Sequence, residues 1–122
     1  MSVCYNHVAL IGRLTKDSEL KETSHQTRAS FVLAVDRPYK KEDGTSETDF
    51  FNVVLWGKRA EILSSYLLKG RLVLVEGRIQ IRQYEQGDVR KSVAEIVAEN
   101  FQFLDYKGNK KESVETEKEF VL

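Results

Sequence analysis

Apolar and polar positions alternate along much of the chain in a way that predicts strands. Five stretches have the length of strands and are rich in β-branched and aromatic residues. They are residues 7–14, 30–36, 49–56, 71–84 and 89–104. Gly12 and Gly77 lie inside the first and fourth stretches and indicate bulges or bends there.

One segment between the third and fourth strands changes to the period of a helix. In residues 58–69, Ala60, Leu63 and Leu67 recur at three- and four-residue spacing, which defines one helix face. Gly70 follows at the position of a C-terminal glycine cap. This segment is therefore predicted to be the single helix.

Polar segments separate the remaining elements. Residues 15–28 suit a long loop or a hairpin tip. Residues 37–48 hold the only proline and an Asp43-Gly44 pair, which is a strong turn signal, so they are predicted to be an exposed loop. Residues 86–88, Gln-Gly-Asp, predict a tight turn between the last two strands.

The predicted order is strand, strand, strand, helix, strand, strand. A five-stranded Greek-key barrel with one helix between strands 3 and 4 is the OB-fold, which binds oligonucleotides and oligosaccharides on its strand 2–3 face and through its loops. The fold class is therefore predicted to be all-β, with an OB-fold domain at residues 1–104. Residues 105–122 mix Gly, Asn, Lys and Glu and predict a flexible charged C-terminal extension.

Length and composition restrict the function classes. A chain of 122 residues fits one domain, and its apolar runs are too short to cross a bilayer. We see no secretory signal, and the absence of disulfides favours the cytoplasm. Cys4 is the only cysteine and is expected to be a small apolar filler. With only two histidines besides, no disulfide, metal centre or cofactor is expected.

The net charge argues against simple electrostatic binding of nucleic acid. The 19 basic and 19 acidic residues give a formal net charge of zero. Non-specific DNA binding relies on Lys and Arg displacing counterions from phosphates. If nucleic acid binds, the basic side chains must be gathered on one face and another force must contribute.

The third strand is apolar on both faces. Phe50 and Trp56 point one way, while Phe51, Val53 and Leu55 point the other. A barrel has one interior, so the second face must contact a partner subunit or the flat face of a base. The rings of Phe50 and Trp56 can stack bases, or they can belong to the core or a subunit interface.

The fourth strand has a cationic face. Arg78, Arg82 and Tyr84 share that face, while Ile79 and Ile81 share the opposite one, which is predicted to be the barrel interior. Arginine pairs with phosphate or stacks on a base, and tyrosine stacks. The alternative is an ordinary solvated sheet face.

The predicted loop at residues 37–48 also combines an aromatic residue with cations. Arg37, Lys40 and Lys41 flank Tyr39. A tyrosine among cations on a loop suits a mobile clamp over a bound strand. The alternative is an ordinary polar loop.

Several spaced motifs resemble one known family. They are Asn6-His-Val-Ala-Leu-Ile-Gly-Arg-Leu14, Phe50-Phe-Asn-Val-Val-Leu-Trp-Gly-Lys58, Tyr66-Leu67, Lys69-Gly70 and Val75-Glu-Gly77. In this order they resemble the signature of bacterial single-stranded DNA-binding proteins over roughly residues 3–104. The resemblance implies a homotetramer of OB-folds in the nucleoid that binds and protects single-stranded DNA, without sequence preference, during replication, recombination and repair.

The resemblance also implies site residues. Stacking rings fall on Tyr39, Phe50, Trp56 and Tyr84. Phosphate contacts fall on Lys21, Lys58, Lys69 and Arg82, and the cationic face of the fourth strand adds Arg78. The family ends in an acidic run with an apolar tip that recruits replication and repair proteins. The segment Glu115-Thr-Glu-Lys-Glu-Phe-Val-Leu122 resembles that tip only in type.

Two other function classes are weighed against this one. An enzyme needs a nucleophile, base or metal set in a pocket, and neither a paired His/Cys/Asp motif nor a glycine-rich phosphate loop is present, so no enzyme is expected. A divergent OB-fold paralogue that binds RNA, or that serves as a primosome protein-interaction module, is the alternative. Site size, oligomeric state and the preference for DNA over RNA stay open.

Overall fold

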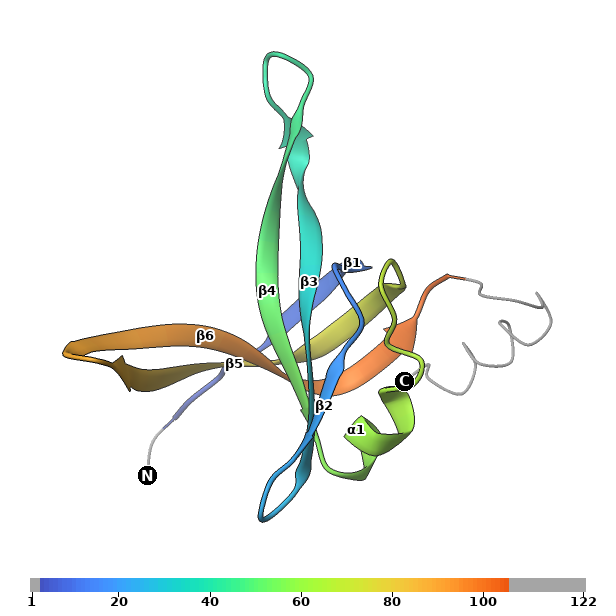
Figure 1. The fold of residues 1–122 in the computed structure, drawn as a ribbon. Helices are drawn as coiled ribbons and strands as arrows, with labels where there is room; N and C mark the ends of the chain where they lie inside the picture. The colour runs from blue at the N-terminus through green and yellow to red at the C-terminus, as the bar shows by residue number, and fades with distance from the viewer. Residues whose placement is uncertain (1–2, 106–122) are drawn as a thin grey trace.

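The computed structural model describes residues 3–105 as strands with one short helix. The elements are β1 (Val8–Leu14), β2 (Glu19–Glu22), β3 (Thr27–Lys40), β4 (Ser46–Trp56), α1 (Lys58–Leu63), β5 (Leu72–Gln86) and β6 (Val89–Phe103), as Figure 1 shows. The five predicted strands are all present, and β2 is an addition to them.

Five of the strands close into a barrel. The strand order is β1-β5-β6-β4-β3, and β1 pairs back onto β3 through Arg13–Ala34 and Leu14–Leu33. The β4–β6 pairing is parallel, and the other pairings are antiparallel. The helix α1 lies between β4 and β5, the third and fourth strands of the barrel. The predicted OB-fold architecture is therefore confirmed.

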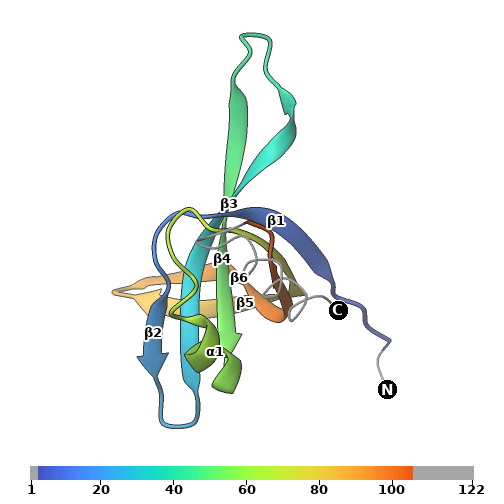
Figure 2. The same cartoon turned by 90° about the vertical axis from the view of Figure 1, so that its right-hand side faces the viewer.

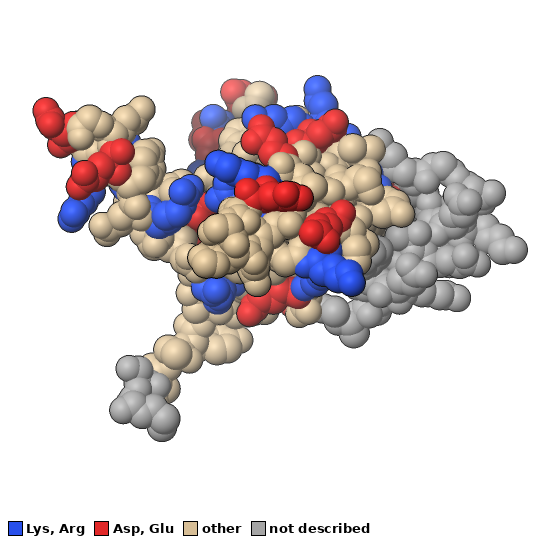
Figure 3. Space-filling view, turned by 60° about the horizontal axis from the view of Figure 1, so that its bottom comes forward, with Lys and Arg blue, Asp and Glu red and all other residues tan. Residues whose placement is uncertain are grey.

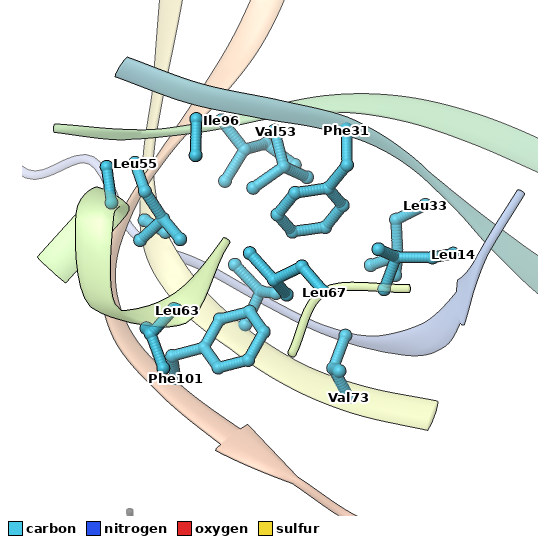
Figure 4. Close-up of a cluster of buried hydrophobic side chains, with 14 of the residues drawn as sticks. Leu14, Phe31, Leu33, Val53, Leu55, Leu63, Leu67, Val73, Ile96 and Phe101 are labelled. Atoms are coloured by element: carbon cyan, nitrogen blue, oxygen red, sulfur yellow. The ribbon is translucent and has the colours of Figure 1, made fainter. Parts of the chain in front are cut away.

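The barrel interior is filled by apolar side chains from α1 and from all five barrel strands (Figure 4). On β4, Val53 and Leu55 are buried in this core and Phe51 packs against it. This settles the ambiguity of the apolar third strand, because Phe50 and Trp56 lie on its outer face and are exposed.

Two of the hairpins extend beyond the barrel in clearly different directions (Figures 1 and 2). One is formed by β3 and β4 and is called the β3–β4 hairpin, residues 35–49. The predicted loop at residues 37–48 is wrong here, because Asp36 pairs with Thr48 and Lys40 with Ser46, so the turn is confined to residues 41–45. A hydrophobic pattern could not predict this strand pairing, because no side chain between Asp36 and Ser46 is buried.

The second hairpin, residues 78–96 of β5 and β6, is called the β5–β6 arm. Ile79 and Ile81 were predicted to face the barrel interior, and this is wrong, since they are 44% and 59% exposed. The register shifts at Glu76/Gly77, where the arm leaves the barrel. A Cβ on Gly77 would lie 2.0 Å from the carbonyl oxygen of Val97, so this predicted bend requires glycine.

The helix is shorter than predicted. It ends at Leu63, and turns rather than helix follow to residue 70, because Ser64 and Ser65 are weak helix formers. Leu67 is still buried, so the apolar spacing correctly predicted which residues face the core. It did not predict where the helix ends. Gly70 has φ +87° and its N–H donates to the carbonyl oxygen of Leu14, so it turns the chain into β5 and does not cap α1.

The polar segment before β3 also differs from the prediction. Within residues 15–28, β2 pairs with the start of β3, with Lys21 opposite Arg28. All four β2 side chains are exposed, so no apolar alternation marks this strand. Cys4, expected to fill the core, is exposed.

The end of β6 is tied to the start of β5 by an ion pair. The buried Arg71 Nε lies 2.9 Å from Asp105 Oδ1, and the Leu72 N–H donates to the same carboxylate. Asp105 therefore bonds back to the barrel, although the sequence placed it in the extension. The remainder of that extension, residues 106–122, lies outside the described residues.

Candidate nucleic-acid interface

The four aromatic residues singled out by the sequence are all exposed. Their exposed fractions are 61% for Tyr39, 65% for Phe50, 40% for Trp56 and 42% for Tyr84. Phe50 and Trp56 share the outer face of β4, Tyr39 lies near the end of β3, and Tyr84 lies on the β5–β6 arm. They are thus distributed over the outer barrel face and both hairpins, and they do not form one cluster.

A groove of about 250 Å³ lies on the outer face of β3 and β4. The outer groove is lined by residues of these strands, of the β5–β6 arm, of β2 and of the segment before β2. The lining residues are Lys16, Glu19, Arg28, Ser30, Phe31, Val32, Asn52, Val53, Val54, Arg82, Val93 and Glu95. Since β3 and β4 are the second and third barrel strands, this is the face that OB-folds use for oligonucleotides and oligosaccharides.

Arg28 joins the outer groove to an exposed ring. It pairs across the strands with Trp56, and its guanidinium carbon lies 5.8 Å from the Trp56 ring centroid, within cation–π range. The sequence reasoning missed Arg28, because it lies at the end of a segment predicted to be a loop. The alternation of Arg28, Ser30 and Val32 with the buried Ala29 and Phe31 was the available signal.

Two cations of the β3–β4 hairpin form ion pairs with carboxylates. Arg37 forms two hydrogen bonds of 3.0 Å to Asp49 and a further one to Glu47, and Lys41 Nζ lies 3.0 Å from Glu47. The hydrogen bond from Arg37 lowers the pKa of Asp49 below its ordinary value, and the same bond raises the pKa of Arg37. In the predicted clamp, Tyr39 is exposed on a paired strand. Two of the cations around it, Arg37 and Lys41, form ion pairs with acidic side chains.

The basic residues predicted for phosphate contacts differ in their surroundings. Arg82 lines the outer groove, and its Nε lies 3.0 Å from Glu95 Oε1. Arg78 donates to the side chain of Gln80 two residues along, which places both on one face of the arm. Lys58 begins α1 and is exposed.

The other two predicted contacts lie on separate elements. Lys21 is exposed on β2, opposite Arg28 of β3. Lys69 is exposed in the turn after α1, where its backbone N–H donates to Asp17. Of the five predicted basic residues, only Arg82 lines the outer groove.

Charge of both signs is mixed on one face of the molecule. Figure 3 shows basic and acidic side chains beside one another across the described part of the face that it draws. Within residues 3–105, no group of three or more His, Cys, Asp or Glu side chains is arranged to hold a metal ion. In the same residues, no helix has the length and apolar character needed to cross a membrane.

A five-stranded barrel with a groove and exposed rings on its β3–β4 face defines the class of OB-fold binding modules. The chain belongs to the single-strand binding protein family, whose family model matches residues 5–104.

Individual relatives agree with this assignment. The Single-stranded DNA-binding protein 1 of Streptococcus pyogenes serotype M18 is 52% identical over 106 residues, covering 85% of this chain and 82% of that protein. The Single-stranded DNA-binding protein 3 of Clostridium acetobutylicum is 55% identical over 104 residues, covering 83% of this chain and 72% of that protein.

A solved structure agrees with the fold. The Plasmodium falciparum SSB in complex with ssDNA matches with a TM-score of 0.76 and 26% identity, covering 86% of this chain and 99% of that one. The resemblance to single-stranded DNA-binding proteins in the sequence is thereby confirmed.

Proposed function

We propose that this chain binds single-stranded DNA without sequence preference. The main support is that Phe50 and Trp56 are exposed on the outer face of β4, a strand that lines the outer groove. The relatives of this chain are named single-stranded DNA-binding proteins. Stacking on an exposed ring contributes about 1–3 kcal/mol per base and is tolerant of base identity, because every base has a π-face.

Aromatic rings and basic side chains divide the work in this proposal. The rings stack bases, and the cations contact the backbone between them. The stacking residues are Tyr39, Phe50, Trp56 and Tyr84, and the phosphate-contacting residues are Lys21, Lys58, Lys69, Arg78 and Arg82. The separation of the rings over the barrel and both hairpins supports a long path for the strand.

The cellular role follows from this binding. The protein protects single-stranded DNA during replication, recombination and repair, in the cytoplasm at the nucleoid, and it acts by binding and not by catalysis. Residues 1–104 carry the DNA-binding domain, and residues 105–122 form the extension, whose end resembles the family's protein-recruiting tip only in type. Membership of the single-strand binding protein family supports this role.

We further propose that the working form is a homotetramer. The exposed Ile79 and Ile81 support it, because exposed apolar side chains on one face of β5 favour burial against another chain. Light scattering of the purified protein tests this, with an expected mass of four times 14.1 kDa. The mass of a single chain would reject the tetramer and leave the DNA-binding proposal standing.

A titration with oligothymidine tests the main proposal. Trp56 is the only tryptophan, so its fluorescence reports on one ring, and stacking is expected to quench it. Competition with duplex DNA and RNA of equal length then measures the preference. Duplex that competes as well as single strand would sink the proposal, because stacking needs unpaired bases. Stronger competition by RNA would favour an RNA-binding module instead.

A further inference from the structure

We propose that Arg28 is a further DNA-binding residue, which holds a backbone phosphate in the outer groove next to the nucleotide that stacks on Trp56. The inference rests on the proposed function and adds a contact that neither the motifs nor the predicted basic residues include. It assigns the outer groove to the phosphate and the Trp56 ring to the base.

The position of Arg28 links the two subsites. Arg28 lies on the outer face of β3, directly across from Trp56, and its guanidinium is 5.8 Å from the centre of that ring. The same side chain lines the outer groove with Ser30 and Asn52. A strand whose base contacts the Trp56 ring therefore passes its sugar-phosphate backbone along this groove.

The hydrogen bonding of Arg28 leaves a donor for a ligand group. Within residues 3–105, Arg28 Nε is the one buried side-chain nitrogen or oxygen atom without a hydrogen-bond partner. The guanidinium groups of Arg37, Arg71 and Arg82 each bond a carboxylate in the same fold. A buried donor on a charged group is unfavourable until an acceptor arrives, and an anion is the best acceptor for it.

The charges around the groove favour phosphate. Three basic residues, Lys16, Arg28 and Arg82, line it together with two acidic residues, Glu19 and Glu95. Glu95 and Arg82 satisfy each other through their ion pair. Lys16 and Arg28 then outnumber Glu19, and the planar guanidinium matches the geometry of phosphate oxygens.

The experiment measures how binding depends on salt. A labelled oligothymidine short enough for one protomer is titrated by fluorescence anisotropy into the wild type, Arg28→Met and Arg28→Lys. The slope of log K against log salt is about 0.7 per phosphate contact on a single strand, so Arg28→Met is expected to lose about 0.7 in slope. Arg28→Lys keeps the charge and is expected to keep the slope.

The matched control is Arg13→Met. Arg13 is exposed, donates to the carbonyl oxygen of Gly70 and does not line the outer groove, so its slope is expected to equal that of the wild type. Thermal unfolding establishes that each variant is folded. An unchanged slope in folded Arg28→Met would overturn the inference while the DNA-binding proposal stands, whereas failure of the wild type to bind would overturn the DNA-binding proposal itself.

A measurement on the wild type keeps the test independent of the variants. The NMR signal of the Arg28 Nε–H is expected to shift when the oligonucleotide is added and to return when high salt releases it. A signal that stays in place while the Trp56 indole signal shifts would also overturn the phosphate contact, because the ring would then be occupied without Arg28.

Discussion

Arg71 follows Gly70 in the sequence and looks like one more basic residue beside the proposed phosphate contacts. In the fold it is buried, pairs with Asp105, donates to the carbonyl oxygen of Tyr66 and lies 4.1 Å from the centre of the Phe103 ring. Arg37 and Arg82 are likewise bound to acids distant in sequence. Residue type therefore predicts which side chains can bind phosphate, but only tertiary pairing decides which of them are available.

The Arg71–Asp105 pair is expected to stabilise the fold and not to bind DNA. Arg71→Met should lower the free energy of unfolding by roughly 3 kcal/mol, because removing one partner of a buried pair leaves the other charge uncompensated. Urea unfolding measures this. The matched control is Arg90→Met, whose pair with Glu85 is exposed and should contribute less than about 1 kcal/mol. Equal effects of the two substitutions would contradict the structural role.

At the scale of the elements, the hydrophobic pattern predicts where strands lie but not every strand or its surroundings. The alternation of apolar and polar residues predicted all five barrel strands. In the third strand, which is apolar on both faces, the prediction that only one face is interior was correct, and Phe51, Val53 and Leu55 lie on that face. The pattern failed at Ile79 and Ile81, because alternation marks two faces of a strand but not where the strand leaves the barrel. It also missed β2, whose exposed side chains carry no apolar signal.

The bulge at Gly77 is expected to set the departure of the β5–β6 arm. Gly77→Ala should destabilise the fold by about 3 kcal/mol, because the added Cβ would clash with the backbone carbonyl of Val97. Relieving the clash requires the backbone of one of the two paired strands to shift. Gly87→Ala is the control, because its Cβ would meet open space and only its positive φ is strained, which costs about 1 kcal/mol. Thermal unfolding compares the two, and a smaller loss for Gly77→Ala would reject the steric explanation.

The β3–β4 hairpin is expected to loosen in acid. The pKa of Asp49 is lowered by the Arg37 hydrogen bond, so its stabilising contribution is complete above the ordinary value of 3.8 and is lost as the pH falls through its lower value in the fold. The NMR signal of the Arg37 Nε–H should therefore titrate with a midpoint below 3.8. In Asp49→Asn that transition should disappear, and a wild-type midpoint at or above 3.8 would show that the pair is absent in solution.

At the scale of the whole molecule, a net charge of zero is combined with a mixture of acids and cations on the described part of the face in Figure 3. The composition argued against a general basic surface. It did not indicate that the opposing acids would include Glu95 in the outer groove and Glu47 and Asp49 on the hairpin. Those placements depend on strand register, which brings together residues far apart in the chain.

Glu95 is therefore expected to restrain DNA binding. Glu95→Gln removes an acid from the outer groove and releases Arg82, so affinity for oligothymidine should rise several-fold at low salt, by about 1 kcal/mol for a partly exposed pair. Because the gain is electrostatic, it should shrink as salt screens the charges. The control is Glu99→Gln, which changes the net charge equally at an exposed position outside the groove. Equal gains for both variants would mean that overall charge, and not the Arg82–Glu95 pair, limits binding.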